Sequence, residues 1–192
     1  DLLESRGLGD VYKRQRGVSF NSNMGNDVAT MDADTVAGVV PSTGWVSTDG
    51  GADAQGGANG SITNGITIDW SSNGTWNTNN GGDNGDNKLM NGYIDAIGGD
   101  GSAQVNISGI NAEFADGYDL YVYFGSDGNN RTGKVALEGG ATYSYNTFSA
   151  QGGDFPAQYT QTTDEADGNP QANYAVYKLS LIHISEPTRL QQ

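Results

Sequence analysis

The chain has 192 residues, no cysteine and a formal net charge of −14, from 23 acidic and 9 basic residues. The absence of cysteine excludes disulfide bonds, thiolate metal sites and cysteine nucleophiles. The acidic balance argues against a nucleic-acid partner, because phosphate binding needs clustered positive charge, and it fits an exported soluble protein, one that meets cations, or simple solubility.

The two ends of the chain differ in composition from the Gly-, Asn- and Asp-rich sequence between them. Residues 5–15 read SRGLGDVYKRQ and residues 179–189 read LSLIHISEPTR. A coding strand for the first segment is the reverse complement of a coding strand for the second over eleven codons, which no folding requirement would produce. The pair resembles a transposase-type sequencing adapter read at both edges of a short insert. We therefore predict that residues 1–15 and 179–192 are adapter-derived, and that residues 16–178 form one domain.

The adapter prediction limits the chemistry of the domain. The only histidine, His183, lies in the second end segment, so Ser-His-Asp and Cys-His mechanisms are excluded. Four acidic and four basic residues lie in the two end segments, so the net charge of the remainder stays at −14. Paired-carboxylate hydrolysis remains, but the spacing of the acidic residues singles out no pair, and we expect no enzymatic activity. No apolar run reaches the length of a membrane span, so no membrane insertion is expected.

The first predicted strands lie in the N-terminal half of the domain. Residues 17–21 (GVSFN) predict a first strand, and residues 34–41 (DTVAGVVP) predict an edge strand that ends at proline. Residues 61–70 (SITNGITIDW) predict the clearest hairpin, because Asn64-Gly65 suits a two-residue type I′ turn. Its second arm alternates apolar and polar residues, which predicts one buried and one wet face.

The second half of the domain continues the pattern of short strands without a helical stretch. Residues 117–124 (GYDLYVYF) predict the strongest strand, with Tyr121 and Tyr123 on one face and aliphatic residues on the other. This pattern predicts an all-β domain, an antiparallel β-sandwich of jelly-roll or galactose-binding-like topology, truncated at its C-terminus so that a further strand is missing. The other predicted strands are residues 88–97, 103–110, 134–137, 142–148, 157–163 and 173–178.

Asn-, Asp- and Gly-rich loops are candidates for structural Ca²⁺, which takes six to eight oxygen ligands on a tightly bent backbone. The first choice is the loop that contains Asp83, Asp86 and Asn87, ahead of residues 127–130 and 164–169. None of these loops matches an EF-hand. The alternative is that they only form turns.

Aromatic side chains in polar surroundings point to carbohydrate, which binds to flat aromatic faces beside hydrogen-bonding groups. The alternative is that the tyrosine faces pack beneath a loop or the second sheet and that the arginine only forms a local salt bridge. The predicted ligand-binding residues are Trp45, Trp76, Tyr121, Tyr123 and Arg131.

Several segments together resemble β-sandwich modules of large exported proteins from Gram-negative bacteria, of the type associated with PEP-CTERM/exosortase sorting. The resemblance implies export to the cell surface or matrix and carries over no functional residue. The segments are residues 37–41 (AGVVP), 75–78 (TWNT), 88–95 (KLMNGYID), 118–123 (YDLYVY) and 131–133 (RTG).

These observations lead to a functional hypothesis with two alternatives. We expect a secreted or cell-surface, non-enzymatic module that binds a polysaccharide or extracellular matrix weakly, with loops stiffened by Ca²⁺. The first alternative is an accessory domain of a glycoside hydrolase or lyase. The second is a purely structural spacer, which would carry no exposed aromatic platform.

Overall fold

The computed structural model describes residues 15, 17–20, 30–48, 58–78, 80, 82–96, 101–110, 114, 117–148, 155, 158–179 and 188–191. The strands in this part of the chain are β1 (Gly17–Phe20), β2 (Trp45–Thr48), β3 (Ala58–Asn64), β4 (Ile66–Ser72), β5 (Gly74–Asn77), β6 (Gly92–Asp95), β7 (Gln104–Ser108), β8 (Tyr118–Tyr123), β9 (Thr132–Leu137), β10 (Thr142–Asn146), β11 (Tyr174–Leu179) and β12 (Thr188–Gln191). One short helix, α1 (Gly85–Leu89), joins β5 to β6.

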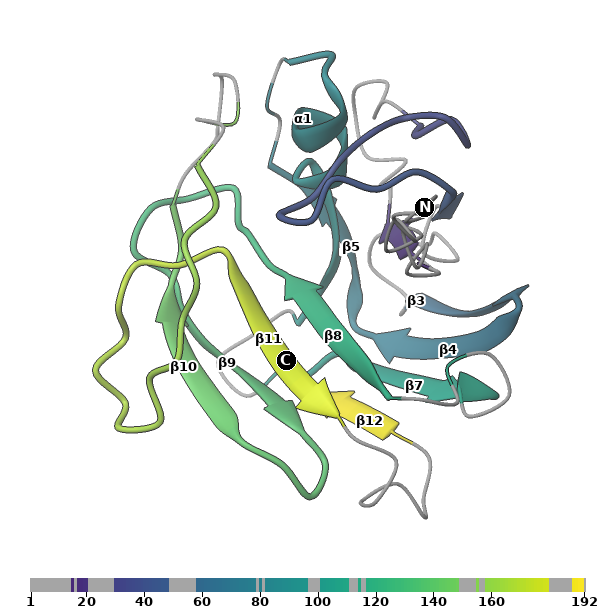
Figure 1. The fold of residues 1–192 in the computed structure, drawn as a ribbon. Coiled ribbons are helices and arrows are strands. Elements are labelled where there is room, and N and C mark those ends of the chain that lie inside the picture. Colours follow the sequence, from purple (N-terminus) through teal and green to yellow (C-terminus); the bar gives the residue numbers. More distant parts are fainter. Residues whose placement is uncertain are drawn as a thin grey trace, which may run out of the picture.

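The described residues form an all-β, sandwich-like structure. Six strands form one sheet in the order β10-β9-β12-β7-β4-β3, and every pairing in it is antiparallel. Figure 1 shows the antiparallel β8–β11 pair lying in front of this sheet, with β5 running upward behind β8. The β1–β2 pair is parallel. No helix in the described part of the chain is long and apolar enough to span a membrane.

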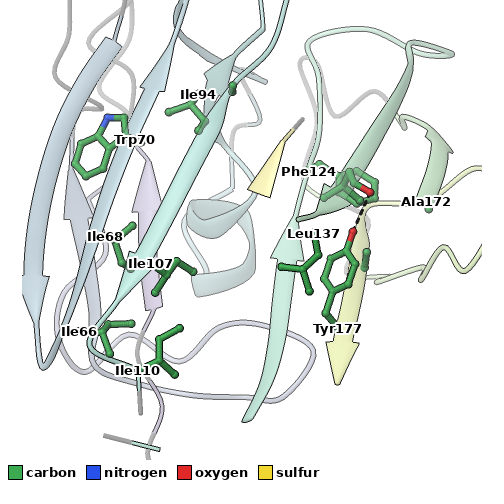
Figure 2. Close-up of a cluster of buried hydrophobic side chains, with 13 residues drawn as sticks. Ile66, Ile68, Trp70, Ile94, Ile107, Ile110, Phe124, Leu137, Ala172 and Tyr177 are labelled. Atoms are coloured by element: carbon green, nitrogen blue, oxygen red, sulfur yellow. Dashed lines mark hydrogen bonds between the residues drawn. The ribbon is translucent and has the colours of Figure 1, made fainter. Parts of the chain in front are cut away.

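The hydrophobic core lies between the six-stranded sheet and the β8–β11 pair. Figure 2 shows Ile66, Ile68 and Trp70 of β4 on the same side of their strand, and each is at least 92% buried. The intervening Asp69 is exposed, so the predicted alternation of this strand is confirmed. On the opposite side of the core the Tyr177 hydroxyl donates to the Val135 carbonyl oxygen at 2.8 Å.

The predicted hairpin of β3 and β4 forms with a tighter turn than expected. Asn64 pairs directly with Ile66, so Gly65 alone connects the two strands. Gly65 has a φ of 77°, a left-handed value that glycine adopts without steric cost. The prediction of a two-residue turn at Asn64-Gly65 was therefore wrong, although the positive φ expected at Gly65 is confirmed.

Helix α1 occupies residues that the sequence assigned to a loop and to the start of a strand. The Asn84 side chain accepts a hydrogen bond from the Asn87 backbone N–H at 2.9 Å, which caps the helix at its N-terminus. The helix therefore takes the first part of the strand predicted over residues 88–97, and β6 begins only at Gly92. The expectation of no helical stretch was wrong at this place.

Two other predicted strands are absent because side chains take their backbone donors. In the predicted edge strand 34–41, the Gly38 N–H donates to the Asp86 carboxylate at 2.8 Å and the Val39 N–H donates to the Tyr123 hydroxyl at 3.1 Å. In the predicted strand 157–163, the described residues form only an isolated bridge between Gln161 and Tyr174. At residues 34–41, hydrogen bonds to side chains that are distant in the sequence therefore replace sheet pairing.

The predicted adapter segments overlap the described residues at Gln15, at Leu179, which is the last residue of β11, and at β12. Strand β12 lies within residues 179–192 and pairs on one side with β7 and on the other with β9. It is the link through which β9 and β10 join β7, β4 and β3. Residues 1–14 lie outside the described residues. The adapter origin of both ends and the domain boundaries at 16 and 178 stay predictions.

Candidate functional site

The aromatic pair Trp76 and Tyr93 lies on the outward face of the β5–β6 pair. The two residues are directly opposite each other in the antiparallel register, so their side chains leave the same face. Thr75 and Ile94, the neighbouring pair, point the other way and are 1% and 6% exposed. Trp76 is 37% exposed, more than any other aromatic side chain in the described part of the chain.

Charged side chains surround this aromatic pair. Asp95 follows Tyr93 by two positions on β6 and therefore shares its face. Asp127 and Arg131 come from the connection between β8 and β9, and the Asp127 Oδ1 lies 2.8 Å from the Arg131 Nη2. The Asp127 backbone lies close enough to the Tyr93 phenol to oppose the rise in the pKa of Tyr93. We call Trp76, Tyr93, Asp95, Asp127 and Arg131 the Trp76 face.

The backbone of the β8–β9 connection lets Arg131 lie close against it. A Cβ atom at Gly128 would lie only 2.9 Å from the Arg131 Nε, closer than such contacts normally come. Asn130 adopts a φ of 59°, which turns the chain just before Arg131. These two positions therefore set the direction in which the guanidinium meets Asp127.

The electrostatics of the Trp76 face are dominated by partial burial and by its two carboxylates. Burial raises the pKa of Asp95, the negative charge of Asp127 raises it further, and Arg131 opposes both effects. Burial likewise raises the pKa of the Tyr93 phenol, with the charges of Asp95 and Asp127 adding to the effect. Tyr93 therefore stays protonated and can donate or accept a hydrogen bond at any ordinary pH.

The Trp76 face borders a large apolar cavity. The cavity has a volume of about 1380 Å³, and its wall includes Ile68 and Leu120 from the two facing layers. Tyr93, Asp95 and Arg131 contribute polar groups to the same wall. Aliphatic walls cannot satisfy the hydroxyls of a sugar, so these polar residues mark where a polyhydroxylated ligand can be held.

The structure separates the residues predicted to bind carbohydrate into two groups. Trp76 and Arg131 both belong to the Trp76 face. Trp45 and Tyr123 instead contact each other, with ring centroids 6.4 Å apart, and the Trp45 Nε1–H donates to the Ser42 carbonyl at 3.0 Å. Tyr121 leaves the same side of β8 as Tyr123 and is half-buried.

Tyr123 is engaged in packing and hydrogen bonding within the protein. Its hydroxyl accepts from the Val39 N–H, and burial raises its pKa to about 12. Together with Trp45 it packs against the small buried cluster of Met31, Ala37 and Leu89. This environment matches the alternative in which the tyrosine face packs beneath a loop.

Sequence reasoning did not single out Tyr93 or Asp95, and it considered Asp127 only within the candidate calcium loop at residues 127–130. A usable signal was present in residues 92–95 (GYID), where strand alternation places the tyrosine and the aspartate on one face. No local pattern relates that strand to Asp127, which is brought in by the connection after β8. The assembly of the site therefore depends on tertiary structure.

The residues predicted to bind Ca²⁺ lie at α1 and have protein partners. The Asp86 Oδ1 accepts from the Gly38 N–H at 2.8 Å and from the Tyr159 hydroxyl at 2.7 Å. The buried Asn87 Oδ1 accepts from the Phe155 N–H at 2.6 Å. The Asp83 side chain is 96% exposed and lies 3.5 Å from the Lys88 ammonium.

These contacts show which protein groups lie around the predicted calcium ligands. Among the described residues, no three acidic or histidine side chains gather closely enough to share an ion. A Ca²⁺ ion at α1 would have to draw also on amide and carbonyl oxygens, and it would compete with the hydrogen bonds of Asp86 and Asn87. Calcium binding stays a prediction.

Comparison with protein-family models, with curated proteins and with solved structures finds no match for this chain.

Proposed function

We propose that this protein is an exported, non-enzymatic β-sandwich module that binds carbohydrate through the Trp76 face. The observation that carries the proposal is the exposed indole of Trp76 opposite Tyr93, beside two carboxylates and a guanidinium. An exposed aromatic ring packs against the apolar face of a sugar, and the charged groups hydrogen-bond to its hydroxyls. We propose a polysaccharide of the cell surface or matrix as the partner.

The polar part of the Trp76 face suits neutral hydroxyls. Asp127 and Arg131 form an ion pair at 2.8 Å, and the guanidinium keeps further N–H groups that can donate to a ligand. The Arg131 side chain is 62% exposed, so a ligand can reach it without displacing the ion pair. Groups that are already oriented lose less entropy on binding, which supports weak but specific recognition.

A jelly-roll or galactose-binding-like topology is part of the proposal, with the β8–β11 pair and the six-stranded sheet as its two layers. The alternative function is an accessory domain of a glycoside hydrolase or lyase, in which the Trp76 face would hold the polymer for a neighbouring catalytic domain. The intact reading frame distinguishes the two, because only the accessory domain requires an adjoining catalytic domain.

A glycan-array screen of the tagged full chain, with and without EDTA, tests the proposal. We expect one class of glycan to bind, and we expect the Trp76→Ala variant to lose that signal while the Val36→Ala variant keeps it. Val36 is 56% exposed and lies outside the Trp76 face, so it controls for loss of an exposed apolar side chain. If no glycan binds with or without EDTA, the purely structural spacer replaces the proposed carbohydrate-binding module.

A further inference from the structure

The Trp76 face carries an uncompensated negative charge at Asp95. Asp127 and Arg131 neutralise each other at 2.8 Å, whereas Asp95 forms no ion pair within the described part of the chain. The influence of Asp127 on Asp95 exceeds the opposing influence of Arg131. A ligand group that approaches Asp95 therefore meets a negative potential, which the overall charge of −14 reinforces.

Aromatic rings stand beside this carboxylate. Tyr93 and Asp95 leave the same face of β6 two positions apart, and Trp76 lies opposite Tyr93. The faces of tyrosine and tryptophan rings attract cations. A positive group placed between the rings and the carboxylate is therefore favoured by both.

This arrangement discriminates among sugars by charge. A uronic acid or a sulfated sugar brings a negative group against Asp95 and Asp127, and juxtaposed like charges cost several kcal/mol. A neutral sugar gains hydrogen bonds alone. A sugar with a free amino group gains hydrogen bonds, a charge-assisted contact with the carboxylate and the attraction of the rings.

We propose that the ligand unit recognised at the Trp76 face is an amino sugar with a free ammonium group, held between Asp95 and the rings of Trp76 and Tyr93. This inference rests on the proposed carbohydrate binding and adds the class of sugar. Acetylation of the amine removes the positive charge and with it the advantage over a neutral sugar. The Asp127–Arg131 pair then binds the adjacent hydroxyls.

Calorimetric titration of the full chain with four matched tetrasaccharides tests this inference, at about pH 6.5 and about 0.15 M salt. The probes are oligomers of glucosamine, N-acetylglucosamine, glucose and glucuronic acid. We expect the glucosamine oligomer to bind at least about tenfold more tightly than its acetylated form, and the glucuronic acid oligomer to bind most weakly. The comparison of ligands on the unaltered chain does not depend on the folding of any variant.

Two variants separate a specific contact from general attraction to an acidic protein. Asp95→Asn should remove the preference for the free amine, so that the glucosamine oligomer binds no more tightly than its acetylated form. Asp34→Asn removes the same charge from an exposed position outside the Trp76 face and should leave the preference intact. An equal loss of the preference for the free amine in Asp95→Asn and in Asp34→Asn would overturn the inference.

The outcomes also distinguish this inference from the proposed function. Equal affinity for the glucosamine, acetylated and glucose oligomers would overturn the amino-sugar inference and leave carbohydrate binding standing. Absence of binding to all four probes, together with a blank glycan array, would overturn both.

Discussion

Trp76 and Tyr93 lie directly opposite each other on β5 and β6, while their neighbours Thr75 and Ile94 face the core. Because Thr75 and Ile94 are buried, the side chains of Trp76 and Tyr93 point outward. Strand pairing holds both aromatic residues in register on the same face of the β5–β6 pair.

Replacement of Trp76 by alanine should weaken carbohydrate binding by about tenfold, because the contact between an aromatic ring and a sugar is lost. The protein should remain folded, since the side chain is 37% exposed. Isothermal titration with a glycan identified on the array measures the affinity. Tyr121→Ala, on β8, is the matched control, and a larger loss in that variant would place the ligand on the outer face of β8 instead.

Asp164 should make folding stability depend on pH at the acidic end. Its carboxylate accepts hydrogen bonds from the buried Ser144 hydroxyl and from the Ala166 and Asn169 N–H groups. These bonds hold the pKa of Asp164 below its ordinary value. The stabilisation is therefore fully present above the ordinary aspartate pKa, about 3.9, and is lost as the pH falls through the lower folded-state pKa.

Urea denaturation of Asp164→Asn across this pH range tests the expectation. The variant should be less stable than the parent near neutral pH, and the difference should shrink as the solution becomes more acidic. Glu165→Gln, at the exposed neighbouring position, should follow the parent. A difference between Asp164→Asn and the parent that stays constant down to the lowest pH would contradict the assignment.

Tyr177→Phe should destabilise the core by about 1–2 kcal/mol. The change removes the hydroxyl that donates to the Val135 carbonyl at 2.8 Å, and it leaves a buried acceptor without its partner. Chemical denaturation at fixed pH measures the change in the free energy of unfolding. Tyr143→Phe alters the adjacent ring, 5.2 Å away, and should have a smaller effect because its hydroxyl has no hydrogen-bond partner among the described residues.

Asp86→Ala should lower the melting temperature even in EDTA, because Asp86 holds Gly38 and Tyr159 through direct hydrogen bonds. Hydrogen bonds to a charged acceptor are worth about 1.5–3 kcal/mol each. Asp83→Ala, at a 96% exposed side chain, should have little effect. A loss of stability that appears for Asp86→Ala only in calcium would instead identify a metal ligand.

The all-β character and several strands could be predicted from the sequence because their signals are local. Alternation of apolar and polar residues identified β4, β7 and β8, and it predicted correctly that Ile66, Ile68 and Trp70 are buried. The strands expected at residues 134–137 and 142–148 also form, and they pair with each other as β9 and β10. In each case the information lies within about ten residues of sequence.

The errors arise where distant side chains compete with local preference. Residues 34–41 have the composition of an edge strand, but Asp86 and Tyr123 take two of their backbone donors. Only Trp76 and Arg131 of the Trp76 face were predicted, because Asp95 and Asp127 come together only after β6 and the β8–β9 connection have folded. Aromatic residues can be identified as candidate ligand-binding residues from the sequence, whereas the burial of Trp45 and Tyr123 depends on which segment covers them.

The chain contains three tryptophans, and their indole N–H signals in a nitrogen-15 NMR spectrum test carbohydrate binding at the Trp76 face most directly. Trp70 is 5% exposed, the Trp45 indole donates to Ser42, and Trp76 is the exposed one. On addition of the glycan, the signal of Trp76 should shift while those of Trp45 and Trp70 stay in place. A shift of the Trp45 signal with Trp76 unchanged, or no shift of any indole signal at saturating glycan, would contradict the account.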